Sequence, residues 1–335
     1  MGYKKRIAAL CMAQAVLAAG YTGDTAWAAE AAASQEAETN QAVEAAAGQE
    51  AETNQIADSG IKLGITLYSL QNEYTVRFAN AAADYAGEKG IELQIYDGNY
   101  DAELQINQVK QMLEDGVDGL ILNPQEAVRC SECVDAAVEA GVPVIAVNTR
   151  VENDGITSYV GSDDVEAGEM IMERAAEALA GKGNVVILEG PLGQSAQLDR
   201  LQGMKNILKE NPGIQVIGDK TANWSRLEAQ TVMAKWLDTF DRIDAVVAEN
   251  DDMALGAVQA IKDDGRIPGE DILVVSIDGS EDAQAAVQEG SILMTVYQNA
   301  EKQACVAIDV LLQALAGEEV YPEYQVPLTP YMVCS

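Results

Sequence analysis

Short apolar segments alternate with amphipathic segments from residue 61 onward, and this alternation is the feature that most restricts the possible folds. The apolar segments are rich in β-branched residues and are apolar on both faces, as in strands of buried parallel sheets. We expect strands at residues 61–68, 91–96, 117–122, 142–147, 159–161, 184–189, 214–218, 244–248, 272–277 and 292–297. The segments between them predict helices, among them residues 74–89, 101–114 and 300–316.

Strands and helices in this order build parallel sheets that are covered by helices on both faces. The pattern is too long for one such sheet, and it divides near Gly161-Ser162-Asp163. A length of 335 residues also agrees with two domains. We therefore predict an α/β protein of two doubly wound, parallel-sheet lobes. Ligands of such sheets bind at the carboxyl ends of the strands, so the residues after each strand are candidates for a site.

The N-terminus has the features of an export signal. A basic start, Lys4-Lys5-Arg6, precedes a short apolar run at residues 7–20, and Ala26-Trp27-Ala28 fits a small-x-small cleavage site. We predict that residues 1–28 are a signal peptide and that the protein is exported, either to the periplasm or to the cell surface. An uncleaved anchor, or a lipid on Cys11, would tether it to the membrane, and both alternatives stay open.

Residues 29–60 are acidic and of low complexity. Residues 31–41 return almost unchanged as residues 45–55, with Gly48 in place of Ser34. Sequence with so few large apolar side chains cannot bury enough surface to fold. We predict a solvated tether between the signal and the folded part.

Charge and composition exclude several classes of function. The chain carries 54 acidic and 21 basic residues, a formal net charge of -33, which disfavours nucleic acid and anionic lipid as partners. It contains no histidine, and histidine is the commonest general base and a common zinc ligand. We expect neither a metal nor a cofactor.

Polar and aromatic side chains follow the predicted strands. Amide, carboxylate and guanidinium groups match the hydroxyls of a polyol, and aromatic faces suit the CH face of a sugar ring. Each position taken alone also fits a turn or a helix cap, but capping explains neither the aromatic residues nor the arginine. The main candidates are Asn72, Tyr74, Asn148, Arg200, Trp224, Asn250, Asp278 and Gln298, and the secondary candidates are Gln71, Thr149, Arg150 and Gln194.

The chain resembles the periplasmic-binding-protein family of the ribose- and galactose-binding type from residue 61 to its end. The resemblance is carried, in the same order along the chain, by GVDGLILNP at 116–124, GVPVI at 141–145, AENDDMALGA at 248–257 and IDG at 277–279. It implies that the eight main candidates contact the ligand. It also implies that Trp224 stacks on the sugar opposite an aromatic residue of the other lobe, for which Tyr74 is the candidate.

The same resemblance implies a type I periplasmic binding protein fold with a three-segment hinge. The crossings are expected near residues 162–163, 298–299 and 326–328. The N-terminal lobe would then comprise residues 61–162 and 299–327, and the C-terminal lobe residues 163–298 and 328–335.

The implied function is capture of a monosaccharide, either a hexose such as galactose or glucose, a pentose, or a cyclitol. The lobes would close on this ligand and deliver it to the permease of an ABC transporter, and a chemoreceptor or sensor kinase is a further partner. Departures from both sugar types leave the sugar open. Asn148 and Thr149 stand where ribose binders have Asp-Arg, and Gln194 and Ala196 stand where galactose binders have a histidine and an aspartate. The calcium loop of the galactose binders is absent.

Other classes of function are open at this point. An enzyme on the same architecture could use Asp251 and Asp278 as acid and base, but the sequence contains no histidine, nucleophile elbow or dinucleotide fingerprint. A transcription regulator would need a basic helix-turn-helix region. A sugar-sensing partner of a membrane receptor is a further alternative.

The cysteines allow a redox or metal interpretation, which we weigh against simple packing. Cys130 and Cys133 form a Cys-x-x-Cys on a predicted helix, without a second pair to complete a zinc site. We interpret them as buried free thiols. A disulfide between Cys305 and Cys334 is compatible with an exported chain.

Overall fold

A computed structural model describes residues 60–333 of the chain. The predicted signal peptide, almost all of the predicted tether and Cys334 lie outside the described residues. Within residues 60–333, each helix is too short or too polar to cross a bilayer.

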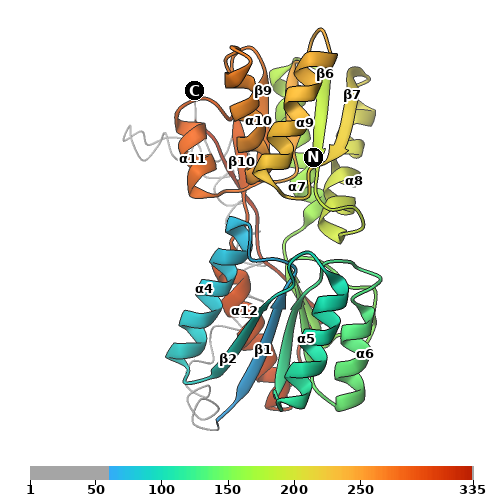
Figure 1. Ribbon diagram of the computed structural model, residues 1–335, viewed down its shortest axis with the longest axis vertical. Coiled ribbons are helices and arrows are strands. Elements are labelled where there is room, and N and C mark those ends of the chain that lie inside the picture. Colours follow the sequence, from blue (N-terminus) through green and yellow to red (C-terminus); the bar gives the residue numbers. More distant parts are fainter. Residues whose placement is uncertain (1–59, 334–335) are drawn as a thin grey trace, which may run out of the picture. The chain divides into compact units, whose positions relative to one another are not determined.

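The first lobe is built on a wholly parallel sheet of strand order β11-β5-β4-β3-β1-β2. Helices α4 and α12 pack together on one face of this sheet, and α5 and α6 pack together on the other (Figure 1). The strands are β1 (Lys62–Leu67), β2 (Glu92–Asp97), β3 (Gly119–Asn123), β4 (Val144–Val147), β5 (Ser158–Gly161) and β11 (Glu323–Gln325). The helices are α4 (Glu73–Glu88), α5 (Ala102–Glu114), α6 (Ser131–Ala140) and α12 (Ala300–Leu315).

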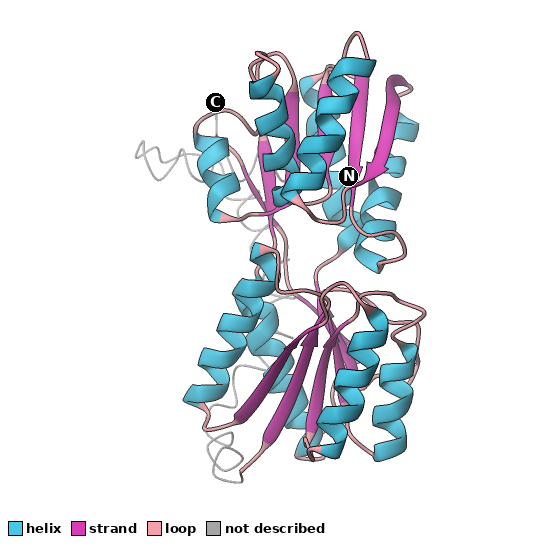
Figure 2. Ribbon diagram, viewed as in Figure 1, coloured by secondary structure: helices cyan, strands magenta, loops and turns pink. Residues whose placement is uncertain are grey.

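The second lobe has a sheet of order β12-β10-β9-β8-β6-β7, in which only the edge strand β12 runs antiparallel. Helix α7 packs with α8 and helix α9 with α10, so that both faces of the sheet are covered (Figure 2). The strands are β6 (Lys182–Glu189), β7 (Gly213–Thr221), β8 (Ala245–Ala248), β9 (Leu273–Asp278), β10 (Met294–Tyr297) and β12 (Thr329–Tyr331). The helices are α7 (Asp164–Ala178), α8 (Ser195–Glu210), α9 (Arg226–Thr239), α10 (Asp251–Asp263) and α11 (Glu281–Gln288).

The predicted fold class is confirmed, and each predicted strand is present with its ends shifted by a few residues. The strands β11 and β12 were not predicted. Each has only three residues and lies at a sheet edge, so neither shows a run of buried apolar residues. The chain crosses between the lobes after β5, between β10 and α12, and between β11 and β12.

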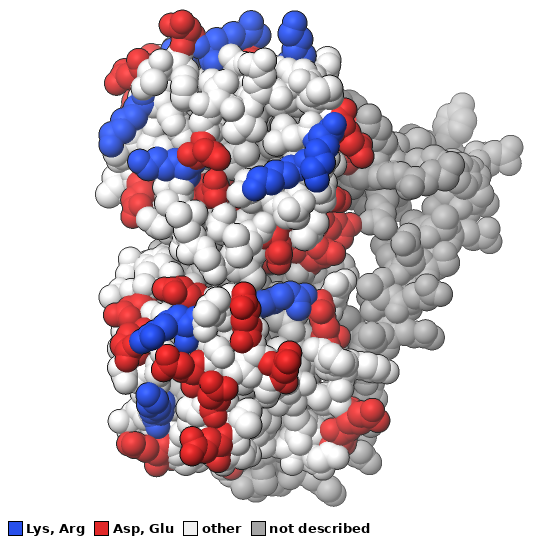
Figure 3. Space-filling model, turned by 90° about the vertical axis from the view of Figure 1, so that its right-hand side faces the viewer, with Lys and Arg blue, Asp and Glu red and all other residues white. Residues whose placement is uncertain are grey.

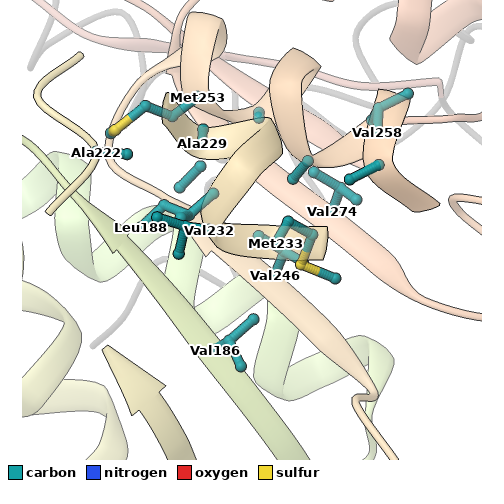
Figure 4. Packing of buried hydrophobic residues seen from close by; sticks show 14 of the residues in the cluster. Val186, Leu188, Ala222, Ala229, Val232, Met233, Val246, Met253, Val258 and Val274 are labelled. Carbon is teal, nitrogen blue, oxygen red and sulfur yellow. The ribbon is translucent and has the colours of Figure 1, made fainter. Parts of the chain in front are cut away.

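Apolar side chains of the central strands form the cores with the inner faces of the helices. In the second lobe, Leu188 and Val246 of the sheet pack with Val232 and Met233 of α9 and with Met253 of α10 (Figure 4). All of these side chains are buried at 9% exposure or less. Burial of such side chains stabilises the lobe by about 25 cal/mol per Å² of apolar surface.

Glycine permits a close approach of α7 and α8. A Cβ on Gly168 would lie 2.0 Å from the backbone oxygen of Arg200, and a Cβ on Gly203 would lie 2.1 Å from the backbone oxygen of Val165. The two helices therefore pack backbone to backbone, and this contact brings Arg200 of α8 against the first turn of α7.

Candidate ligand site

The carboxyl ends of the strands of both sheets meet around a cavity, which we call the inner cavity. Its walls come from both lobes. The lining residues are Tyr68, Tyr74, Asn148, Thr149, Gln194, Ala196, Arg200, Trp224, Asn250, Asp278 and Gln298. The cavity has a volume of about 10 Å³, roughly what a single water molecule requires. A sugar-sized ligand therefore enters only if the lobes separate or the lining side chains move.

Arg200 is the cation of the inner cavity. It is 3% exposed, and its Nε donates to Oδ1 of Asp164 at 2.8 Å while Nη1 donates to the backbone oxygen of Glu249. Burial acts to lower the pKa of the guanidinium, but the charges of Asp164 and Asp278 outweigh it and raise the pKa. Arg200 thus stays charged and is held in one orientation, ready to donate to a ligand oxygen.

Asp278 ends β9 and faces the same space with an unusual backbone, at φ 128°. Its Oδ1 accepts from Nε2 of Gln298 at 3.2 Å, and Oε1 of Gln298 accepts from Nδ2 of Asn148 at 3.0 Å. Burial raises the pKa of the Asp278 carboxyl well above its usual range, against the opposing charge of Arg200. These three side chains form a polar chain from one lobe to the other, with acceptors and donors that suit hydroxyl groups.

Asp251, the other carboxylate that could serve in catalysis, is fully occupied by the protein. It accepts from the hydroxyls of Ser276 and Thr295 and from the backbone nitrogen of Ser280. Burial raises its pKa to about 6. Asp251 therefore ties the end of β9 to α10 and is not presented to a ligand.

Trp224 contributes the largest aromatic face, and its position depends on a glycine. The indole is 4% exposed, its Nε1 donates to Oε1 of Gln194 at 2.7 Å, and the guanidinium carbon of Arg200 lies 5.4 Å from the ring centroid. A Cβ on Gly190 would lie 2.0 Å from Cζ2 of this ring. The residue at position 190 must be glycine for the indole to occupy this place.

Tyr68, a buried aromatic residue that lines the inner cavity, shares a hydrophobic cluster with Trp224. It directly follows β1 and was not among the predicted site residues. Tyr74 lines another part of the inner cavity and donates its hydroxyl to Oε1 of Gln303 at 2.7 Å. The predicted strand at residues 61–68 included Tyr68, whereas β1 ends at Leu67, so the rule that site residues follow strands did not select Tyr68.

Asn72 and Asn250 act as helix caps, the ordinary alternative for asparagine at such positions. Oδ1 of Asn72 accepts from the backbone nitrogen of Thr75 at 3.1 Å, and its Nδ2 donates to the Tyr68 hydroxyl at 2.9 Å. Asn72 therefore lies behind Tyr68 and orients it, whereas Asn250 caps α10 and also lines the inner cavity.

The secondary candidates have different positions. Thr149 and Gln194 line the inner cavity, and the amide of Gln194 donates to Oε1 of Gln125 across the lobes at 3.1 Å. The Arg150 guanidinium points elsewhere, since it lies over the Tyr159 ring at 3.9 Å and pairs with Glu323 at 2.8 Å.

A second and larger cavity adjoins the inner one, and we call it the outer cavity. Gln71 lines it, and its volume is about 530 Å³. Trp224 lines both cavities, so its ring forms part of the wall between them. The remaining lining residues are Tyr100, Gln125, Pro191, Asn223, Ser225, Arg226, Leu227, Glu228 and Asp252.

The positions of acidic and cysteine side chains within residues 60–333 bear on the metal and redox interpretations. In that part of the chain, histidine, cysteine, aspartate and glutamate side chains form no cluster of three that could hold a metal ion. Cys130 and Cys133 are free thiols buried at the start of α6.

On the face in Figure 3, basic side chains are scattered among acidic ones over both lobes.

Comparison with known proteins identifies related chains. The family model of the periplasmic binding protein domain matches residues 63–319. A xylitol-binding protein of Mycolicibacterium smegmatis is 37% identical over 79% of this chain and 76% of its own length. The ribose import binding protein of Bacillus subtilis is 32% identical over 79% of this chain and 85% of its own. Among solved structures, an ABC transporter solute binding protein from Bacillus halodurans with bound myo-inositol aligns with a TM-score of 0.78 at 33% identity, over 82% of this chain and 95% of that one.

Proposed function

We propose a function from one premise: this chain belongs to the periplasmic binding protein domain family. It captures a small neutral polyhydroxylated molecule, either a monosaccharide or a related polyol, between its lobes and delivers it to an ABC transporter. The observation that carries this proposal is the inner cavity, where a fixed guanidinium, a chain of amides and a carboxyl group converge from both lobes beside aromatic faces.

The proposed contacts follow from the geometry of that cavity. Arg200 and Asp278 bond the ligand hydroxyls, and each bond to the charged Arg200 guanidinium contributes about 1.5–3 kcal/mol. Asn148, Asn250 and Gln298 supply further donors and acceptors. Tyr74 and Trp224 contact the CH faces of the ligand, with Tyr68 as a third aromatic wall and Asn72 as its support.

Capture and release require the lobes to separate or the lining side chains to move, because the inner cavity has too little room for a sugar. We propose hinge closure about the three crossings, with residues 61–162 and 299–327 moving against residues 163–298 and 328–335. A ligand favours the closed state only through contacts made to both lobes at once. Contacts to both lobes are available in the inner cavity, since the first lobe contributes Asn148 and the second contributes Gln298 and Arg200.

The chain does no chemistry on its ligand under this proposal, since Asp251 is engaged by Ser276, Thr295 and Ser280. We propose that the protein is exported and acts outside the cytoplasm, where a permease receives the ligand. The relatives that were compared bind or import polyols and sugars by name, which supports the ligand class but does not select one member.

Isothermal titration calorimetry of the purified protein tests this function. Xylitol, ribose, galactose, glucose and myo-inositol form the panel, and at least one is expected to bind with micromolar or better affinity, about -8 kcal/mol. The variant Arg200→Ala should abolish binding, and the matched variant Arg129→Ala, at an exposed arginine that lines neither cavity, should leave it intact. Turnover of a panel member, or no binding by any polyol or sugar, would refute the proposal.

A further inference from the structure

The outer cavity has the size of a ligand site. Its volume of about 530 Å³ falls within the range of about 300–1,000 Å³ that small-molecule sites occupy. Gln71, Tyr100 and Gln125 line it from the first lobe, and residues of the second lobe line the opposite side. A ligand there would touch both lobes and would stabilise the closed state as one in the inner cavity does.

Aromatic rings continue from the inner cavity into the outer one. Tyr68 lines the inner cavity and Tyr100 the outer cavity, and their ring centroids are 5.8 Å apart at an interplanar angle of 46°. Trp224 of the other lobe lines both. The two cavities therefore share one run of aromatic surface, with a place for a sugar face at each end.

Backbone strain accompanies this arrangement in both lobes. Asn99 and Tyr100 have φ of 47° and 57°, and Asn223 and Trp224 have φ of 54° and 57°. Such left-handed conformations are uncommon for residues other than glycine and are energetically unfavourable, most of all for the aromatic residues. The two strained pairs place the two aromatic residues of the outer cavity, one from each lobe. Strain kept at two separate loops that line the same cavity indicates a function of that cavity.

The polar groups of the outer cavity suit hydroxyls and disfavour anions. Nδ2 of Asn223 donates to Oε2 of Glu228 at 2.8 Å, and Arg226 pairs with Asp252 at 3.0 Å. Arg226 also pairs with Asp282 at 2.9 Å, so its charge is already neutralised. The carboxylates repel a phosphate or a carboxylate ligand, whereas amides and carboxylates pair readily with hydroxyls.

We propose that the inner and outer cavities together form one site for a neutral saccharide of two linked sugar units. One ring lies in the inner cavity, which admits it only after the lobes or the lining side chains move, and the second lies in the outer cavity beside Tyr100, with Trp224 in contact with both. This proposal rests on the proposed function, because it assumes that the inner cavity holds a sugar, and it extends the ligand class from monosaccharides to disaccharides.

Calorimetry with matched pairs of ligands tests the proposal on the full chain. Glucose is compared with cellobiose and maltose, galactose with lactose, and xylose with xylobiose. At least one disaccharide is expected to bind about tenfold more tightly than its monosaccharide, since a second ring adds an aromatic contact and hydroxyl bonds.

The variant Tyr100→Ala should reduce that preference to about twofold. The matched control is Tyr321→Ala, which removes an exposed tyrosine that lines neither cavity and should change neither affinity. Thermal unfolding of each variant tests whether it folds. If Tyr100→Ala does not fold, the comparison of disaccharide with monosaccharide affinity on the wild-type protein still decides the proposal.

Three outcomes separate the proposals. Monosaccharide binding without a tighter disaccharide overturns the two-unit site and leaves the proposed function standing. A disaccharide preference that survives Tyr100→Ala unchanged also overturns it, because the second ring then lies elsewhere. Binding of neither ligand class overturns both proposals together.

Discussion

The substitution Gly190→Ala tests how the structure places Trp224. The φ of Gly190 lies outside the left-handed region, so alanine is compatible with the backbone and the effect is steric. The added Cβ would lie 2.0 Å from Cζ2, 2.1 Å from Cη2 and 2.4 Å from Cε2 of Trp224. Carbon atoms in contact stay about 3.5–4.0 Å apart, so the ring must move by roughly 1.5 Å.

A shift of that size breaks the 2.7 Å hydrogen bond from Nε1 of Trp224 to Gln194. Overpacking costs about 1–3 kcal/mol, and the unsatisfied buried donor costs a similar amount. We expect the free energy of unfolding to fall by about 2–6 kcal/mol. Loss of the aromatic contact, worth about 0.5–1.5 kcal/mol, should weaken ligand affinity about 2- to 12-fold.

Urea denaturation measures the stability, calorimetry measures the affinity, and a double-mutant cycle with Trp224→Phe isolates the clash. Phenylalanine lacks the indole atoms that meet the added methyl group, so Gly190→Ala should cost less than 1 kcal/mol in the Trp224→Phe background. An equal loss of stability in both backgrounds would show that the methyl group does not clash with the indole.

Three further predictions concern stability. Gly87→Ala, at an exposed position of helix α4 where an added Cβ meets no atom within 4 Å, should raise the free energy of unfolding by about 0.5–1 kcal/mol; a lower free energy of unfolding, measured by urea denaturation, would contradict this. Asp164→Asn leaves Arg200 without its buried partner and should destabilise the protein by about 3–5 kcal/mol. Glu103→Gln, at an exposed ion pair with Arg129, should change stability very little. Equal losses of stability would show that burial does not strengthen the dependence on the Asp164–Arg200 pair. Burial raises the pKa of Asp251 to about 6 and that of Asp278 well above its usual range. The native state therefore binds more protons than the unfolded chain from about pH 4 up to about pH 6 at Asp251 and up to its own raised pKa at Asp278, and stability should rise as pH falls through this range. Asp278→Asn should flatten this dependence, and an unchanged slope of the free energy of unfolding against pH, measured by urea denaturation, would refute the assignment to Asp278.

The sequence alone determined the fold class and the ends of the strands near which candidate residues lie. Segments such as residues 142–147 and 244–248 are apolar at nearly every position, and this pattern is set by local composition because both faces of a parallel strand are buried. The predicted strands therefore matched β4 (Val144–Val147) and β8 (Ala245–Ala248) closely. The edge strands β11 and β12 carry no such pattern and became visible only in the structure.

Tertiary structure decided which of the candidate side chains face a common space. Tyr68 lies in the cluster of Trp224, Asn72 supports Tyr68 from behind, and Arg150 turns to Glu323, a residue 173 positions away in the chain. Each of these outcomes depends on packing between segments that are distant in sequence, such as the contact of Gly190 with Trp224. Local propensity and periodicity specify a strand and its end, but the direction of a side chain beyond that end is set by its neighbours in space, which a single sequence does not reveal.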